Sequence, residues 1–345
     1  MTSTAVIQVK PGIGDVIWHL PFIRAIAAIS PGGIVTFLAP PSSGAKELLA
    51  GEPCVSETFY FEHFGSEFRR GINLIRLILL LRRCRFRTLW ILDRTIRPAL
   101  AAKLAGIPNR IGLGLGPQRW FITNSGIGEE HFHDHPIGWL TALLGATNVP
   151  LPTTEPCLSV CNNLYVAIGE RFRGLRRPWI VIGIGASDPR RDWPDDYWVH
   201  FLSGLRSLTL GTVFLIGGGQ NEARAQAMLT RSAAALSINA CGMRLGEVLA
   251  LLRHADLFFG TDSGPMNLAV AVGTPAFVLF GVNPALGYSK YIHAIEPPGG
   301  QTSEGMRRIS PAQALARVAL YLSQEKEGGN RAYPSSSQGC GQLLS

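Results

Sequence analysis

The sequence predicts an α/β protein with two domains, each built on a parallel sheet. Its 345 residues correspond to two domains of about 150 residues each. Short apolar segments typical of buried strands alternate with segments of helical periodicity, in two series along the chain. The composition is 46% hydrophobic and 16% charged, which excludes a disordered chain.

The first series begins near the N-terminus. A helix is expected at 16–28, where Val16, Leu20 and Ile23 fall on one stripe. A second helix is expected at 93–104. The expected strands of this series are 5–9, 34–38 and 88–92.

The second series begins at Trp179. Apolar residues recur at helical spacing from Trp198 to Leu205, and Pro194 and Ser310-Pro311 are typical of helix starts. The expected strands are 179–184, 212–216, 256–259 and 276–280. The expected helices are 194–205, 222–236, 245–254, 265–272 and 310–322.

A segment rich in Pro, Thr and Asn, 146–165, separates the two series. We therefore expect one domain at 1–165 and a second at 166–325. The Ser/Gly/Gln-rich end, 326–345, is expected to be a disordered tail.

The net charge of +8 favours an acidic partner such as a nucleotide, a phosphorylated glycolipid or a membrane surface. This charge is evenly shared, with 15 basic and 11 acidic residues in 1–165 and 17 and 13 in the remainder. Because neither half is a basic module by itself, no nucleic-acid partner is expected.

A cytoplasmic location is expected, because residues 1–10 lack the basic start and apolar core of a secretory signal. The longest uncharged run, 263–289, is interrupted by glycines and prolines and is expected to be a buried helix, turn and strand. Without a CxxC pair, the cysteines are expected to be reduced thiols. They are Cys54, Cys84, Cys157, Cys161, Cys241 and Cys340.

The first candidate site is the run Lys10-Pro11-Gly12-Ile13-Gly14-Asp15, between the first strand and the first helix. Glycines allow a sharp turn close to a ligand, and open α/β sheets bind ligands at the carboxyl ends of their strands. Asp15 is placed to act as a general base on an acceptor hydroxyl. The structural alternative is a carboxylate that complements the helix dipole.

The second candidate is Gly260-Thr261-Asp262-Ser263-Gly264-Pro265, which follows a strand and opens a helix. Free N–H groups at a helix N-terminus bind anions, and Ser263 adds a hydroxyl donor, so a diphosphate fits here. Asp262 would then accept hydrogen bonds from sugar hydroxyls. An ordinary capped turn is the alternative.

Two further strand-to-helix loops carry charged side chains. Arg190 and Arg191 follow the strand that ends near Gly183, and either bind phosphate oxygens or lie in solvent. Glu222 ends a Gly217-Gly218-Gly219 loop, and either accepts from ribose or sugar hydroxyls or complements a helix dipole. Neither loop completes G-x-G-x-x-G, which argues against an NAD(P)-dependent oxidoreductase.

Two other patterns have structural alternatives. Segment 69–87 is apolar and rich in arginine, which is typical of a helix on an anionic membrane surface or of a core-facing helix with a solvated rim. Its arginines are Arg69, Arg70, Arg76, Arg82, Arg83, Arg85 and Arg87. His131, His133 and His135 would share one face of a strand and could hold a metal, but a surface loop is the favoured interpretation.

Taken together, the four loops resemble glycosyltransferase family 9, the ADP-heptose:lipopolysaccharide heptosyltransferases, over roughly residues 5–322. The motifs that carry the resemblance are Gly14-Asp15-Val16-Ile17 with Leu20-Pro21, Arg110-Ile111-Gly112, Trp193-Pro194 with Trp198, Asp262-Ser263-Gly264-Pro265 with Leu268-Ala269, Gly273-Thr274-Pro275, and Leu279-Phe280-Gly281.

The resemblance implies a GT-B fold, with two Rossmann-like domains facing a cleft, the acceptor side first and the nucleotide-sugar side second. It implies inverting transfer without a metal or other cofactor, most simply of heptose from ADP-heptose to a lipopolysaccharide-core or related glycan acceptor. At the matching positions Asp15 is the implied base. The residues implied to bind the nucleotide sugar are Lys10, Gly14, Arg191, Glu222, Met243, Asp262, Ser263 and Gly264. A non-catalytic nucleotide- or glycan-binding protein on the same fold is the alternative.

Three positions depart from the family pattern. Trp18 stands where the family usually has His, although His19 follows it, and Asn267 stands where a second His is usual. Arg191 replaces a Lys, which keeps the cation but changes its geometry. These differences bear on the identity of the donor more than on the type of reaction.

Overall fold

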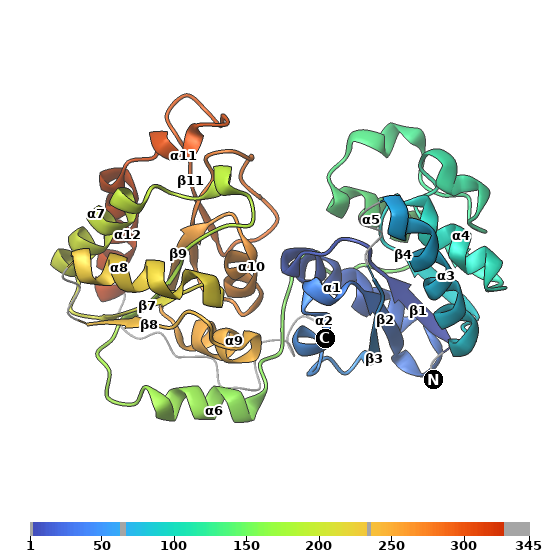
Figure 1. Cartoon of the computed structure of the whole chain (residues 1–345), viewed down its shortest axis with the longest axis horizontal. Helices are drawn as coiled ribbons and strands as arrows, with labels where there is room; N and C mark the ends of the chain where they lie inside the picture. Colours follow the sequence, from blue (N-terminus) through green and yellow to red (C-terminus); the bar gives the residue numbers. More distant parts are fainter. Residues whose placement is uncertain (1–2, 63–66, 233–235, 328–345) are drawn as a thin grey trace. The chain divides into compact units, whose positions relative to one another are not determined.

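The computed structural model describes residues 3–62, 67–232 and 236–327, without the side chains of 67–70 and 325–327. Within these ranges the chain forms two compact units, one made of the described residues up to Pro156 and one beginning at Cys157 (Figure 1). The expected tail lies outside the described residues from 328 onwards. Each unit is an α/β layered structure on its own sheet, as the sequence predicts.

The first unit contains a five-stranded parallel sheet in the order β3-β2-β1-β4-β5. Val6 in the central strand lies opposite Phe37 on one side and Trp90 on the other. The strands are β1 (Thr4–Ile7), β2 (Val35–Ala39), β3 (Val55–Tyr60), β4 (Thr88–Ile91) and β5 (Asn109–Ile111). The α-helices are α1 (Ile13–Ala28), α2 (Ala45–Leu48), α3 (Glu67–Cys84), α4 (Ile96–Leu104) and α5 (Pro136–Ala146).

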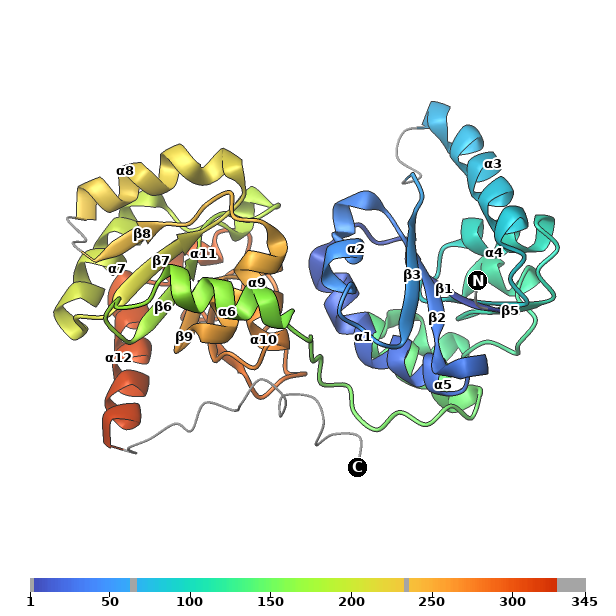
Figure 2. The ribbon, with the colours of Figure 1, turned by 90° about the horizontal axis from the view of Figure 1, so that it is seen from below.

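Helices cover both faces of this sheet (Figure 2). On one face, α3 and α4 bury an apolar core in which Leu77 and Leu81 meet Ile7 and Ile91. Helices α1 and α5 contact each other and lie on the opposite face. The strands are therefore buried on both sides, which explains why the central ones read as continuous apolar runs.

The second unit contains a six-stranded parallel sheet in the order β11-β10-β9-β6-β7-β8. The strands are β6 (Trp179–Gly183), β7 (Thr212–Ile216), β8 (Ser237–Asn239), β9 (Leu257–Thr261), β10 (Ala276–Leu279) and β11 (Ile292–Ile295). The α-helices are α6 (Asn162–Arg171), α7 (Asp195–Leu208), α8 (Glu222–Ser232), α9 (Leu245–His254), α10 (Gly264–Ala271), α11 (Gly305–Arg308) and α12 (Pro311–Glu327).

The core of this unit is rich in aromatic side chains. Trp193, Trp198, Phe201 and Phe259 are buried, and the Phe201 and Phe259 rings stack with centroids 3.9 Å apart. Helices α7, α8 and α12 supply this face, and α6, α9 and α10 lie on the other (Figure 2). Short 3₁₀ helices complete both units: η1 (Pro31–Gly33), η2 (Pro41–Ser43), η3 (Gly116–Trp120), η4 (Glu129–His133), η5 (Pro189–Arg191) and η6 (Gly219–Asn221).

Two details differ from the sequence expectations. Helix α6 lies partly in the segment 146–165 and packs on α9, and the units divide before Cys157 rather than near residue 165. Cys157 is disulfide-bonded, which corrects the expectation of reduced thiols at that position, and Cys340 lies outside the described residues. The thiols of Cys54, Cys84, Cys161 and Cys241 are free.

None of the helices in the described part of the chain has the length and apolarity that crossing a bilayer requires.

The strand order reverses once in each sheet. From β1 the first sheet grows through β2 to β3, and the chain then returns to place β4 on the other side of β1. In the second sheet β7 and β8 lie on one side of β6, and β9 lies on the other. Ligands of open α/β sheets bind at such switch points, outside the carboxyl ends of the strands. Each unit therefore offers one such position.

Two glycines that face each other on β6 and β9 leave room for one buried aromatic ring. Gly183 pairs with Gly260, and the buried Phe258 ring covers both. A Cβ added at Gly183 would lie 2.8 Å from Phe258 Cζ, and one added at Gly260 would lie 2.6 Å from the same atom. The pair is therefore sterically required at the switch point of the second sheet.

We expect Gly260→Ala to destabilise the protein by about 1–3 kcal/mol, because the added methyl group overpacks the Phe258 ring. Gly287→Ala is the control, since nothing lies within 4 Å of a Cβ there, and it should change the free energy of unfolding by less than about 0.5 kcal/mol. Urea unfolding of the full chain measures both. Equal midpoints for the two variants would contradict the packing argument.

Candidate active site

The loop from β1 to α1 brings together the two charged residues that the sequence predicts there. Lys10 Nζ lies 3.4 Å from Asp15 Oδ1, with side chains 38% and 31% exposed. Asp15 lies in the first turn of α1, two positions after its first residue, and Gly14 lies between them. A Cβ at Gly12 would be 2.6 Å from Asp15 Oδ2, so Gly12 gives the carboxylate its position over the loop. The carboxylate is thus fixed yet accessible.

A buried polar pair supports this loop from below. Gln8 Nε2 donates to the Lys10 carbonyl over 2.9 Å, and Gln8 Oε1 lies 2.7 Å from His19 Nδ1. Because an amide oxygen only accepts, His19 donates from Nδ1 in this arrangement. Burial, with the Lys10 charge as a second cause, lowers the pKa of His19 to about 3. His19 is therefore a neutral support beneath the loop.

The end of β4 is joined to the same loop by Asp93. One carboxylate oxygen, Oδ2, accepts from the Val9 N–H over 3.0 Å, and Oδ1 accepts from the N–H and hydroxyl of Thr95. Gln118 Nε2 donates to the Asp93 carbonyl over 2.7 Å. Burial raises the pKa of Asp93. These bonds hold the carboxyl ends of β1 and β4 together at the switch point of the first sheet.

In the second unit an arginine and an aspartate meet across the switch point. Arg191, at the end of η5, donates from Nη1 to the Asp262 carbonyl over 3.0 Å and pairs with Asp262 Oδ2 at 3.3 Å. Its Nη2 donates to Ser187 Oγ over 3.1 Å. Asn283 Nδ2 donates to the same Asp262 Oδ2 over 2.9 Å. Asp262 is thereby held by two donors from two different loops.

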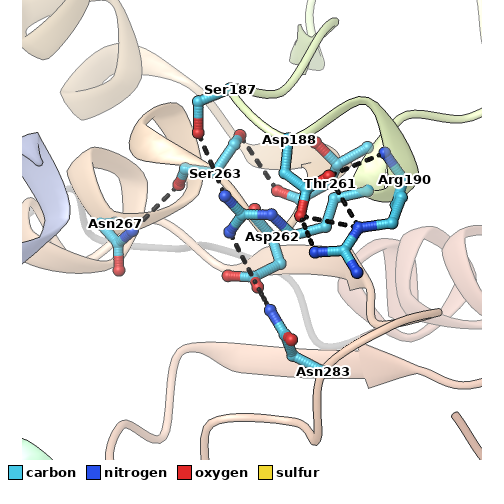
Figure 3. A network of polar contacts seen from close by, with 9 residues as sticks. Ser187, Asp188, Arg190, Thr261, Asp262, Ser263, Asn267 and Asn283 are labelled. Carbon is cyan, nitrogen blue, oxygen red and sulfur yellow. Dashed lines mark hydrogen bonds and ion pairs between the residues drawn. The ribbon is translucent and has the colours of Figure 1, made fainter. Parts of the chain in front are cut away.

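The N-terminus of α10 adjoins this pair. Ser263 is the N-cap residue, but its side chain makes no capping bond and donates instead to the Thr261 carbonyl over 3.2 Å. Gly264 is the first helical residue. Asn267 is buried and donates from Nδ2 to the Ser263 carbonyl over 2.9 Å (Figure 3). The first N–H groups of α10 are consequently left without a side-chain cap, which suits an anion.

The predicted residues Glu222 and Met243 lie in two neighbouring loops. Glu222 is exposed at the start of α8, and Met243 is half-buried before α9. The Gly242 N–H donates to the Gly217 carbonyl over 3.0 Å, which ties the two loops together. A Cβ at either Gly185 or Gly217 would lie 3.0 Å from Asn221 Nδ2, so the Asn221 side chain fills the space between the loops after β6 and β7.

Arg224 braces the Arg191 loop from behind. It extends from α8 and donates to Asp192 Oδ2 over 2.5 Å and to Asp195 Oδ1 over 2.6 Å. Between them, the buried Trp193 donates from Nε1 to the Ile309 carbonyl over 3.0 Å. Asp192, which follows Arg191, is therefore held by the Arg224 guanidinium, and Trp193 is held by the core. These two contacts fix the backbone next to Arg191 and so limit where the Arg191 guanidinium can reach.

The three histidines of 131–135 do not share a strand face. Residues 129–133 form η4, His131 Nδ1 lies 2.7 Å from Asp134 Oδ2, and His135 Nδ1 accepts from the Ile137 N–H over 3.3 Å. Within 3–62, 67–232 and 236–327, no group of three or more His, Cys, Asp and Glu side chains could hold a metal ion.

Sequence reasoning did not single out Asn283, Arg224, Asp93, Gln118 or Gln8. Asp93 gives one signal, as a charged residue directly after a buried strand, but the helix expected at 93–104 begins at the same position. The others lie in segments whose local pattern is ordinary.

Comparison with known proteins agrees with this architecture. The sequence matches glycosyltransferase family 9 (heptosyltransferase) over residues 74–294, which is more than half of the chain. The structure of E. coli ADP-heptose lps heptosyltransferase II is similar, with a TM-score of 0.75 and 22% identity over 94% of this chain and 100% of that one. A glycosyl transferase family 9 structure from Veillonella parvula has a TM-score of 0.77 and 18% identity, covering 93% and 97%. No curated protein matches the sequence.

A third structure, E. coli heptosyltransferase WaaC with ADP-2-deoxy-2-fluoro heptose, has a TM-score of 0.68 and 16% identity, covering 93% of this chain and 99% of that one. At these identities the likeness shows the fold, which is of the GT-B type with two Rossmann-like domains. The fold class implied by the sequence resemblance is therefore confirmed.

His19 makes the first unit sensitive to acid. Its pKa of about 3 in the folded chain lies below the ordinary 6.5, so between these values the unfolded chain binds a proton that the folded chain does not. The free energy of unfolding should fall as the pH decreases through this window, by up to about 1.4 kcal/mol per pH unit, and this contribution is complete above pH 6.5.

His19→Gln removes this titration but keeps an N–H donor for Gln8, so the stability of the variant should depend less steeply on pH. Urea unfolding at several pH values within the window measures the difference. His200→Gln, on the exposed side of α7, serves as the control and should retain the wild-type slope. A slope unaltered by His19→Gln would contradict the assignment.

Proposed function

The chain belongs to glycosyltransferase family 9, and from that premise we propose that it transfers heptose from ADP-heptose to a lipopolysaccharide-core or related glycan acceptor. In this proposal the transfer inverts the anomeric configuration and needs no metal. The Asp15 carboxylate acts on the acceptor, and the cluster of Arg191, Asp262 and α10 binds the donor.

The Arg191–Asp262 cluster is the observation that carries the proposal. A nucleotide diphosphate gains charge as the glycosidic bond breaks, and a guanidinium beside the N-terminus of a helix stabilises such charge without a metal. Both donors to Asp262, from Arg191 and Asn283, contact Oδ2. Among the described residues this leaves Oδ1 to accept from a hydroxyl of the sugar, while Ser263 and Gly264 receive the diphosphate.

The adenosine part of the donor fits the neighbouring loops. The Glu222 carboxylate accepts hydrogen bonds from the ribose hydroxyls, and the Met243 side chain contacts the adenine ring through its polarisable thioether. The bond from Gly242 to Gly217 supports this assignment, because it holds the two loops at one end of the sheet.

The acceptor reacts at Asp15. Its carboxylate takes the proton of the acceptor hydroxyl, the hydroxyl oxygen forms a bond to the anomeric carbon, and the bond from that carbon to the diphosphate oxygen breaks. Attack opposite to the leaving group inverts the configuration and releases ADP. Lys10, 3.4 Å from Asp15, holds the carboxylate in place.

Buried side chains without a positive charge occupy both positions where the family resemblance implies His. Trp18 is 8% exposed, and Asn267 is 7% exposed and bonded to the Ser263 carbonyl. Neither side chain can supply a cation. Arg191 therefore carries more of the charge stabilisation, which is consistent with a guanidinium in place of the usual Lys.

Arg191→Ala should weaken ADP binding by about 10- to 100-fold, because it removes charge-assisted hydrogen bonds worth about 1.5–3 kcal/mol. Titration calorimetry measures the affinity. Arg190→Ala is a matched control, since Arg190 is the preceding residue but pairs with Asp188 and is 65% exposed, and it should bind ADP as the wild type does.

The same titration with UDP, GDP and NAD distinguishes the donor, and ADP should bind most tightly. Equal affinities of the two arginine variants would remove Arg191 from the site. Tighter binding of another nucleotide would overturn the ADP-heptose assignment but leave the family unchanged.

Asp15→Asn should lower kcat by about 10²- to 10⁴-fold, as expected for loss of a general base, and leave the affinity for ADP unchanged. Release of ADP from ADP-heptose and acceptor measures turnover, and NMR of the product shows the anomeric configuration. Glu47→Gln, exposed on α2, is the control. Near-normal turnover of Asp15→Asn, or a product with retained configuration, would refute the mechanism.

A further inference from the structure

We propose that the outward face of α3 is a docking surface for an anionic lipid bilayer. This inference goes beyond the transfer reaction and rests on the first unit alone. It begins from the fact that α3 is apolar on two opposite faces.

The inner face of α3 is accounted for by the core, where Leu77 and Leu81 are 1% and 0% exposed. The outer face carries Ile72, Ile75 and Leu79, which are 48%, 58% and 58% exposed. Spacings of three and four residues place these three side chains on one stripe of the helix. Single exposed apolar residues are ordinary on a protein surface, but an adjacent row on one helix marks an interaction site.

Leu104 extends the stripe beyond α3. It lies at the end of α4 and is 49% exposed. Arg82 Nη2 donates to the Leu104 carbonyl over 2.9 Å, which ties the end of α3 to the end of α4. In Figure 2 these two helices lie side by side on the same face of the first sheet. We call Ile72, Ile75, Leu79 and Leu104 the apolar stripe.

Arginines border the apolar stripe on both sides. At 100° per residue, Arg76 and Arg83 fall on one side of Leu79 and Arg82 falls on the other, and all three are exposed. The sequence has no acidic residue from 71 to 92. An acidic side chain, Glu62, does face the arginines. Its Oε1 lies 2.5 Å from Arg76 Nη1, and both side chains are more than half exposed.

This combination matches a bilayer surface better than it matches a second copy of the chain. Acyl chains accept the aliphatic side chains while lipid phosphates pair with the arginines, whose stems can reach outward from the stripe. A two-fold dimer through the same face would place the arginine rim against an identical rim, and like charges repel. An acidic protein partner is the remaining occupant, and a face suited only to such a partner would leave the chain unbound to anionic vesicles in the test.

The test is co-sedimentation of the purified full chain with vesicles of phosphatidylglycerol and phosphatidylcholine, compared with vesicles of phosphatidylcholine alone. The wild type should bind the anionic vesicles at low salt, bind the neutral ones at least tenfold more weakly, and dissociate at about 0.5 M salt as charges are screened. Ile75→Ser with Leu79→Ser, and separately Arg76→Gln with Arg83→Gln, should each weaken binding at least tenfold.

Matched controls come from the second unit. Leu210→Ser with Leu320→Ser removes two leucines that are 69% and 59% exposed, and Arg173→Gln with Arg307→Gln removes two arginines that are 77% and 73% exposed. Both controls should bind anionic vesicles as the wild type does. Turnover of a water-soluble acceptor should be normal in all four double variants, which separates this proposal from the transfer reaction.

Three results would overturn the proposal. The wild type could fail to bind anionic vesicles, or the control pairs could lose binding as fully as the α3 pairs. Alternatively, the wild type could form a concentration-dependent dimer in sedimentation equilibrium that Ile75→Ser with Leu79→Ser abolishes, which would make the face a protein interface. Thermal melts of each variant exclude loss through unfolding.

Discussion

The pairing of β6 with β9 is the constraint on which the donor site depends. It sets Gly183 opposite Gly260 and so places the loops that leave the two strands next to each other. Arg191 and Asp262 are 71 residues apart in the sequence, yet their side chains form an ion pair because each follows one of these strands. The β1–β4 pairing has the same effect in the first unit, where it joins the Lys10 loop to Asp93.

The sequence predicted the interior of both sheets and missed their edges. The strands it did not predict are β3, β5, β8 and β11, and these are the outermost strands of the two sheets. Central strands such as β6 and β9 are buried throughout and read as apolar runs, whereas an edge strand such as β3 mixes exposed and half-buried residues. Hydrophobic periodicity reports burial, so it fades where one side of a strand meets solvent.

The residues of the candidate site also differ in how strong a local signal they leave in the sequence. Lys10, Asp15, Arg191 and Asp262 were predictable because each lies in a strand-to-helix loop, where glycines and charges form a local pattern. Asn283 was not predictable, because it contacts Asp262 from a loop 21 residues further along the chain. Contacts of this kind arise from the packing of whole elements and leave no trace in local composition, so a single sequence cannot reveal them.

The candidate loops of the two units are supported by contacts of different charge. A neutral pair supports the loop of the first unit, and ion pairs support the loop of the second. Under Lys10 the support is the buried Gln8–His19 pair, in which burial keeps His19 neutral. Behind Arg191 the support is charged, because Arg224 pairs with Asp192 and Asp195 on either side of the buried Trp193. Each arrangement leaves its functional cation committed to one carboxylate, and a preorganised pair of this kind costs little reorganisation when a charged ligand arrives.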